Sequence, residues 1–159
     1  MRRFAEETSV PISRSRGEID KLLRDWGATG IQWTDQFDLD CVTLQFIWPR
    51  DEERYMARFS VGLPSEQKLA PHAVDGRSGR TSERKLAALL VNRGRREHRV
   101  LLLWLKAALN AVDAGIVSAE TIFLPFLVGR DGRTVAEVAV PRLSQLIGGD
   151  ASRLLTAHK

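Results

Sequence analysis

A run of basic residues has the clearest chemical meaning in this sequence. It spans residues 92–99, reads Asn-Arg-Gly-Arg-Arg-Glu-His-Arg, and continues directly into the apolar residues 100–105. Guanidinium groups bind phosphate oxygens through paired hydrogen bonds, and an apolar run can fix them to a rigid core. The run therefore predicts a group of cationic side chains that the protein presents to a polyanion. Its candidate nucleic-acid contacts are Arg93, Arg95, Arg96, His98 and Arg99.

The positive charge of the chain is concentrated around this run. Residues 65–99 carry nine Lys and Arg against four Asp and Glu, whereas the net charge of the whole chain is +4. A solvated helix face can have the same composition, so the charge alone leaves that interpretation open. The further candidate contacts in this segment are Arg77, Arg80, Arg84 and Lys85.

Three aspartates form the second group of residues that could do chemistry. Asp35, Asp38 and Asp40 flank a predicted strand turn, and clustered carboxylates can hold Mg²⁺ for phosphodiester hydrolysis. Aspartate is also a preferred turn residue, and no Glu-x-Lys companion occurs on a neighbouring strand. Turn formation is therefore the expected role, with a metal-dependent nuclease as an alternative.

Motifs of the common enzyme classes are absent. The sequence has no P-loop, no glycine-rich dinucleotide fingerprint, no paired-cysteine zinc pattern and no Gly-x-Ser-x-Gly elbow. Its three histidines, His72, His98 and His158, lack partners at metal-ligand spacing. We therefore expect a non-enzymatic protein with no catalytic residue, no metal and no cofactor.

Length and composition indicate one domain. The chain has 159 residues, of which 43% are hydrophobic, enough for a core. No apolar leader or membrane-spanning stretch is visible, so we expect no membrane association and a cytoplasmic location. The single cysteine, Cys41, excludes an internal disulfide and is expected half-buried on a strand.

The N-terminal region predicts an arm and a helix. Residues 1–12 have no helical period and are expected to be extended. Ser15 with Glu18 matches a capping box, and Gly27 stands where a helix end favours a left-handed residue. A first helix is therefore expected between these signals.

Residues 29–64 then alternate apolar and polar side chains, which is typical of half-buried strands. Turn residues at 35–38 and 49–53 divide this segment into a three-stranded antiparallel meander. We expect one face to pack under the first helix. Trp33 and Trp48 could then lie in the core or, less commonly, act as stacking platforms for bases.

A loop and a long helix follow. Residues 65–80 show no periodicity and predict a mobile loop. Thr81 or Ser82 can cap a helix that runs to about Ala114 and whose basic half extends beyond the core. Gly94 is its weak point, and two helices hinged there are an alternative.

The last part of the chain predicts a helical layer. A short helix precedes a tight turn at 130–133, and Thr134 caps a helix that ends near residues 148–149. Pro141 predicts a kink or restart inside that helix. Residues 150–159 form a tail.

These elements define the expected fold class and division of the chain. The class is α+β, with an N-terminal helix on a three-stranded antiparallel meander, a long basic and amphipathic helix, and a C-terminal helical layer. The single domain 1–159 then divides into an arm, the helix with its meander over 13–64, the loop, a helical part over 81–149, and the tail.

Several segments together resemble a family of small proteins encoded in phages, prophages and related mobile elements. They are residues 8–15 (TSVPISRS), 18–19, 96–107, 111–116 and 131–135 (DGRTV). The resemblance covers most of the chain, with a departure in the short connection after Pro64. It implies a genomic setting and assigns no catalytic residue.

The leading functional hypothesis is a non-enzymatic accessory protein that binds DNA or RNA through phosphate contacts along an Arg-rich helix. The main alternative is a protein–protein interaction module, a subunit or inhibitor of a larger nucleoprotein complex, since arginine also favours such interfaces. The sequence leaves open whether the chain forms a homo-oligomer.

Overall fold

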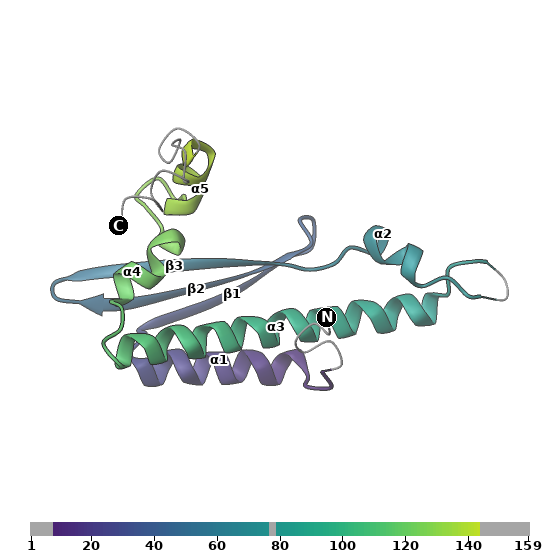
Figure 1. Cartoon of the computed structure of the whole chain (residues 1–159), viewed down its shortest axis with the longest axis horizontal. Coiled ribbons are helices and arrows are strands. Elements are labelled where there is room, and N and C mark those ends of the chain that lie inside the picture. Colours follow the sequence, from purple (N-terminus) through teal and green to yellow (C-terminus); the bar gives the residue numbers. More distant parts are fainter. Residues whose placement is uncertain (1–7, 77–78, 144–159) are drawn as a thin grey trace, which may run out of the picture.

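The fold is α+β, as predicted. In the computed structural model, which describes residues 8–76 and 79–143, a three-stranded antiparallel sheet carries two helices on one face. Figure 1 shows these helices, α1 and α3, side by side beneath the sheet. The short C-terminal helices lie at one end of the sheet, and α2 lies toward the other end, above α3.

Helix α1 (Ile12–Trp26) begins earlier than predicted. Pro11 precedes it, and the Ser15 amide already donates to the Pro11 carbonyl at 3.2 Å. The expected capping box at Ser15 is therefore wrong, because this side chain is fully buried on the same helix face as Ile19. The predicted C-terminus is confirmed by Gly27, which adopts a left-handed φ of 111°.

The predicted three-stranded meander is confirmed. Its strands are β1 (Gly30–Gln36), β2 (Cys41–Arg50) and β3 (Glu53–Gly62), in the order β1-β2-β3. Because side chains alternate along a strand, one face of the sheet is apolar and points toward α1 and α3. Its buried members are Val42, Leu44, Phe46, Trp48, Ala57 and Phe59.

Helix α3 (Glu83–Asp113) is continuous over 31 residues, so the hinged alternative at Gly94 is wrong. A Cβ at Gly94 would lie 3.0 Å from Cδ1 of Ile12, which shows how closely α1 approaches α3 there. No helix among the described residues combines the length and apolarity needed to cross a membrane. The apolar stripe of α3 comprises Leu101, Leu102, Leu105, Ala108 and Leu109.

The segment expected as an irregular loop over 65–80 contains regular structure. It holds α2 (Glu66–Leu69) and a 3₁₀ turn, η1 (Ala70–His72), followed by an antiparallel bridge between Val74 and Thr81. The helix is too short to produce a detectable period. Leu69 nevertheless fixes it to the molecule, since its side chain is only 6% exposed.

The region after α3 begins with α4 (Ala119–Phe123) and a 3₁₀ turn, η2 (Leu124–Phe126). Phe123 is fully buried and ties this region to the core. The predicted tight turn at 130–133 is present, with Gly132 at a φ of 77°.

The predicted cap at Thr134 is confirmed, because its side chain and that of Glu137 form a reciprocal capping box. Helix α5 (Val135–Ala139) is short and gives way to the 3₁₀ turn η3 (Val140–Arg142). Pro141 lies in this turn, which agrees with the predicted restart.

Several sequence predictions lie wholly or partly outside the described residues. They concern part of the arm (residues 1–7), the candidate contact Arg77, the end of the last predicted helix and the tail from residue 150.

Aromatic side chains form the centre of the core. The Phe46 ring lies 5.5 Å from those of Trp48 and Phe123, 6.0 Å from Phe59 and 6.5 Å from Trp26, measured between centroids. Such contacts add specific edge and stacking interactions to the burial of apolar area. The cluster therefore joins α1, the sheet and α4.

We predict that Phe46→Ala lowers the free energy of unfolding by about 3–5 kcal/mol, because it leaves a cavity in this cluster. Urea unfolding followed by tryptophan fluorescence measures the loss. Phe37→Ala is the matched control, since Phe37 is 89% exposed in the β1–β2 turn and should change stability by less than about 0.5 kcal/mol. Equal losses in both variants would contradict the assignment of the core.

Candidate nucleic-acid interface

Helix α3 arranges six of the predicted cationic contacts on one side. At 100° per residue, they fall within about 180° of its circumference, and one edge of this range adjoins the apolar stripe at the angle of Leu102. Two of the three acidic side chains of α3, Glu83 and Glu97, fall outside this arc, whereas Asp113, at the C-terminal end of the helix and 14 residues beyond Arg99, falls within its angular range. Up to Arg99, charge is therefore segregated around the helix. We call these six residues the basic arc: Arg84, Lys85, Arg93, Arg95, Arg96 and Arg99.

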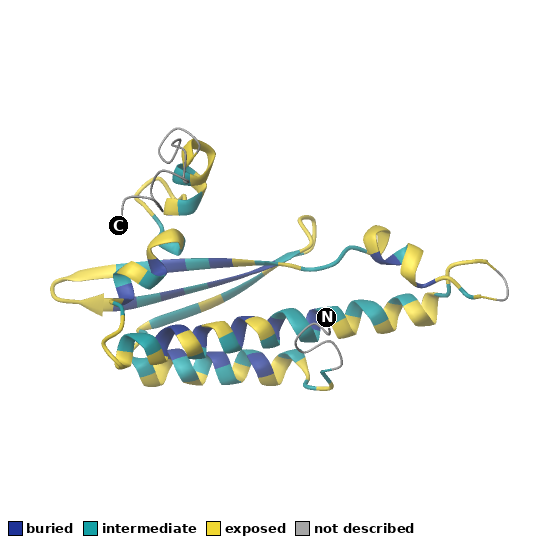
Figure 2. Cartoon of the chain, viewed as in Figure 1, coloured by how far each residue is buried: buried dark blue, intermediate teal, exposed yellow. Residues whose placement is uncertain are grey.

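The N-terminal part of α3 extends beyond the sheet and α1, as Figures 1 and 2 show. The buried residues of α3 begin only at Gly94. Arg84 and Lys85 are exposed in this projecting part, and Arg80 is exposed just before it. The Ser82 side chain caps the helix start, and the Lys85 ammonium group lies 3.4 Å from the Val74 carbonyl oxygen.

The inner members of the basic arc are half-buried and partly neutralised. Arg99 donates to Glu18 of α1 at 3.1 Å, and Arg96 lies 3.3 Å from the carboxylate of Glu97. Although burial opposes ionisation, hydrogen bonds from Arg99 and Arg14 hold the pKa of Glu18 below its ordinary value.

By contrast, the described part of the chain offers no ion-pair partner to Arg84, Arg93 or Arg95. These three guanidinium groups are therefore the members of the arc best placed to meet an external anion.

His98 does not belong to this surface, which corrects the sequence prediction. Its side chain is only 1% exposed and both ring nitrogens are engaged. The Arg16 guanidinium can only donate, so Nε2 accepts from Arg16 Nε at 3.1 Å and Nδ1 donates to the Gly94 carbonyl at 2.8 Å. Burial, reinforced by the charge of Arg16, lowers the pKa of His98, against opposing contributions from Gly94, Asp35 and Glu97.

The contacts of His98 belong to a polar network that joins both long helices to β1. The Arg16 guanidinium binds the Asp35 carboxylate through two hydrogen bonds of 2.6 and 3.2 Å. It also lies 4.9 Å from the ring centre of Trp33, which stacks on His98 at 5.9 Å. Trp33 is therefore a structural residue rather than a free platform for bases, and Trp48, which is 4% exposed, is part of the core.

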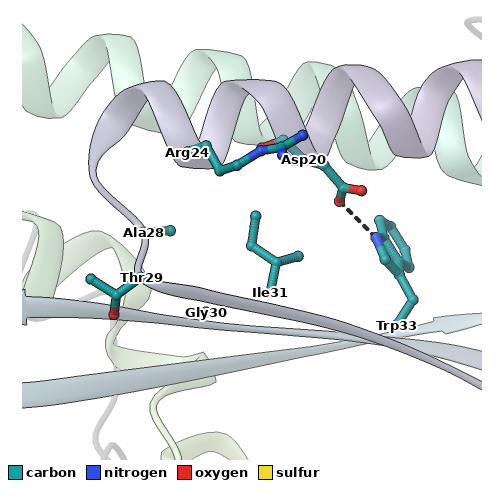
Figure 3. A pocket seen from close by; sticks show the side chains of 7 residues that line it. All are labelled: Asp20, Arg24, Ala28, Thr29, Gly30, Ile31 and Trp33. Carbon is teal, nitrogen blue, oxygen red and sulfur yellow. Dashed lines mark hydrogen bonds between the residues drawn. The ribbon is translucent and has the colours of Figure 1, made fainter.

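A pocket of about 340 Å³ lies between α1 and β1 beside this network (Figure 3). Asp20 and Arg24 line it from the helix, and Ile31 and Trp33 line it from the strand. The Trp33 indole donates to Asp20 at 2.8 Å, so one carboxylate oxygen is already engaged. The pocket offers hydrogen-bonding groups but no paired acid and base at reacting distance.

Two of the three clustered aspartates have a structural role: Asp35 at the end of β1 and Asp40 in the β1–β2 turn. Asp35 is held by Arg16, whose hydrogen bonds lower the pKa of this carboxyl despite its partial burial. Asp40 adopts a positive φ of 47°, which aspartate tolerates better than most residues. Over residues 8–76 and 79–143, no three His, Cys, Asp or Glu side chains come together in a group that could hold a metal ion.

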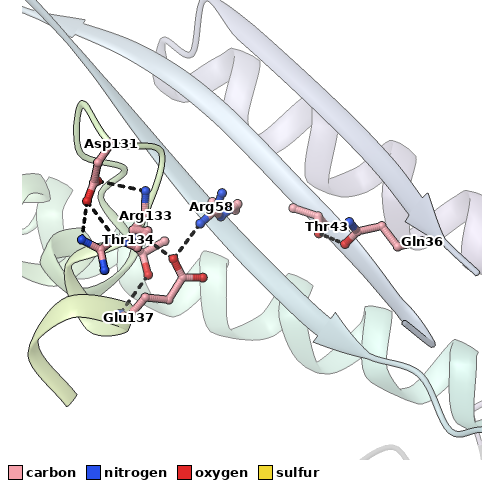
Figure 4. Close-up of polar contacts among 7 residues, drawn as sticks. All are labelled: Gln36, Thr43, Arg58, Asp131, Arg133, Thr134 and Glu137. Carbon is pink, nitrogen blue, oxygen red and sulfur yellow. Dashed lines mark hydrogen bonds and ion pairs between the residues drawn. The ribbon is translucent and has the colours of Figure 1, made fainter. Parts of the chain in front are cut away.

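The sheet face opposite the helices is polar and carries the attachment of α5. Figure 4 shows Arg58 of β3 reaching Glu137 of α5, an ion pair of 2.8 Å. On β1 and β2, the Gln36 side-chain oxygen accepts from Cys41 and Thr43. Cys41 is half-buried, as predicted.

Sequence reasoning missed one concave, basic site. A pocket of about 370 Å³ lies between α2 and α3, where Lys68 and His72 meet Arg93 and Glu97. Lys68 and His72 come from the segment predicted as a loop, and Arg93 lies 25 residues beyond Lys68 in the sequence. The concentration of basic residues over 65–99 was the signal available, but it could not pair these particular residues.

No protein-family model, curated protein or solved structure matches the chain. The resemblance to proteins of phages and mobile elements therefore stays a prediction.

We predict that the free energy of unfolding falls as the pH is lowered from about 7.5 to about 5.5, because of His98. Below its ordinary pKa of 6.5, the histidine binds a proton in the unfolded chain but not in the folded protein, where its pKa is lowered. Protonation therefore favours unfolding. Above the ordinary pKa this stabilising contribution is complete. Urea unfolding at several pH values measures the slope.

The variant His98→Gln should flatten this pH dependence, because it removes the buried imidazole. An NMR titration of the wild-type His98 ring gives a second measurement that needs no variant. An ordinary or raised pKa for this ring would contradict the prediction.

Proposed function

We propose that the protein is a non-enzymatic accessory protein of a phage or mobile element that binds DNA or RNA through the phosphate backbone. The observation that carries the proposal is the segregation of charge around α3. Six cationic side chains occupy the basic arc between Arg84 and Arg99, and the two acidic side chains of that part of the helix, Glu83 and Glu97, lie outside it. A strand or duplex that follows the helix would therefore meet positive charge along its path.

The dimensions of the basic arc suit a contact with several phosphates. Arg84 and Arg99 are separated by 15 residues of one helix, which corresponds to about 22 Å along its axis. Phosphates of one DNA strand are spaced by about 3.4 Å along the duplex axis. The arc could therefore meet a handful of phosphates without reading base edges, which predicts little sequence preference.

The proposal is tested by fluorescence anisotropy with labelled single-stranded DNA, duplex DNA and RNA over a salt series. If about five phosphates are neutralised, log K should fall with log[salt] at a slope near −4.5 for duplex DNA. Changing Arg84, Lys85 and Arg95 together to alanine should weaken binding to every sequence and reduce the steepness of that slope by about 3.

Arg54, Arg130 and Arg142, all changed to alanine, form the matched control. They are exposed arginines outside α3, so the same loss of three charges should have a much smaller effect. No salt-sensitive affinity of the wild type for any polymer would overturn the proposal. Equal losses of affinity in both triple variants would show that binding depends on net charge alone and not on the basic arc.

A protein–protein interaction module is the second candidate. It is favoured by exposed apolar side chains at the β1–β2 turn, where Phe37 is 89% and Leu39 is 63% exposed. The pair between Arg99 and Glu18 also illustrates that arginines of α3 can bind carboxylates.

This second candidate predicts a defined oligomer or a hetero-complex in light scattering, together with weak affinity for nucleic acid. Phe37→Ala with Leu39→Ala should then dissociate the complex without lowering the stability of the chain. A strict monomer that captures no partner would count against it.

A further inference from the structure

The pocket between α2 and α3 combines two cations with an apolar wall. Leu63 and Pro64, which follow β3, form one side of it, and Lys68 of α2 lies on another. Arg93 and Glu97 line it from successive turns of α3. Residues that are far apart in sequence therefore converge on one hollow of about 370 Å³, which is broadly open to solvent.

The two cations of this pocket, Lys68 and Arg93, share it with the carboxylate of Glu97 but form no ion pair with it. Neither Lys68 nor Arg93 takes part in an ion pair among residues 8–76 and 79–143. Arg93 is half-buried, so part of its side chain already packs against the protein without a ligand. His72 adds a third nitrogen donor at the rim. These groups favour a phosphate-bearing ligand.

Glu97 makes a bare phosphate a poor fit, since like charges repel in the same hollow. Arg96 engages Oε1 of Glu97, and Oε2 can still accept a hydrogen bond from a ligand. The preferred ligand must therefore offer both an anion and a donor, such as a sugar hydroxyl or an exocyclic amino group. Leu63 and Pro64 suit the apolar faces of a sugar or base.

We propose that this pocket binds a single unpaired nucleotide, with its phosphate on Lys68 and Arg93 and a hydroxyl or amino donor on Glu97. The inference rests on the proposed function, since Arg93 lies both at the edge of the basic arc and in the pocket. A strand held along α3 would bring a nucleotide to this point. A base paired in a duplex cannot enter, because it is stacked between its neighbours.

The first experiment is an NMR titration of the full chain with cytidine 5′-monophosphate, adenosine 5′-monophosphate, the two nucleosides and inorganic phosphate. We expect both mononucleotides to bind about tenfold more tightly than either phosphate or nucleoside. Only a mononucleotide offers both a phosphate for Lys68 and Arg93 and a hydrogen-bond donor for Glu97. Lys68→Ala and Arg93→Ala should each weaken mononucleotide binding by about tenfold. Lys85→Ala, an exposed cation of the same basic arc, is the control and should change it less than about twofold.

Glu97→Gln separates ligand contact from a structural role. The variant keeps the shape of the side chain but removes its charge, so affinity for inorganic phosphate should rise while the preference for mononucleotides over phosphate shrinks. An unchanged preference would overturn the role given to Glu97. Failure of the wild type to bind any mononucleotide would overturn the pocket assignment.

The second experiment compares a blunt duplex with the same duplex carrying an unpaired overhang, using fluorescence anisotropy. We expect the wild type to prefer the overhang, and Lys68→Ala to remove this preference while retaining most of the affinity for the blunt duplex. The triple variant of Arg84, Lys85 and Arg95 should instead lose affinity for both. Equal binding of both duplexes by the wild type would overturn the pocket assignment and leave the proposed function standing. Binding of mononucleotides without binding of any polymer would overturn the proposed function and support the pocket.

Discussion

The packing of the C-terminal part of α3 against α1 and the sheet is the interaction on which the rest of the structure depends. Leu102, Leu105 and Leu109 are fully or almost fully buried there, and burial of such side chains contributes about 1.5–3 kcal/mol each. A 31-residue helix is too long for this small sheet to cover. The buried part therefore holds the exposed N-terminal part rigidly in solvent, where the basic residues begin.

The same packing decides which cations are available for binding. Where α3 lies against α1, Arg99 pairs with Glu18, and Arg16 is engaged by Asp35 and His98. Farther toward the N-terminus of α3, beyond Gly94, α1 does not cover the helix, and the cations face solvent or the α2 pocket. The available positive charge is thus centred on Arg84, Arg93 and Lys68, toward the N-terminal end of the run 93–99 and beyond it, so α2 becomes part of the surface that the basic arc presents.

Much of the fold could be predicted because long elements impose a period on the sequence. Strand alternation identified the meander, and the apolar stripe identified α3.

The predictions that failed did so for local reasons. Ser15 looks like a cap in sequence, but the close contact of two helices buries it. His98 lies three and seven residues before Leu101 and Leu105, so the helical period already placed it on the apolar stripe, and its position within a basic run concealed this. The pocket at Lys68 could not be predicted, since it requires α2 to fold back over α3.

The most direct test of the account is a residue-by-residue map of nucleic-acid binding, obtained from backbone amide NMR spectra of the wild type with a short oligonucleotide at two salt concentrations. The account predicts salt-sensitive shifts concentrated between Arg80 and Arg96, extending to Lys68 and His72, with the β2–β3 turn and α5 unchanged. Shifts centred on the polar face of the sheet or on the β1–β2 turn, or no shifts at low salt, would contradict it.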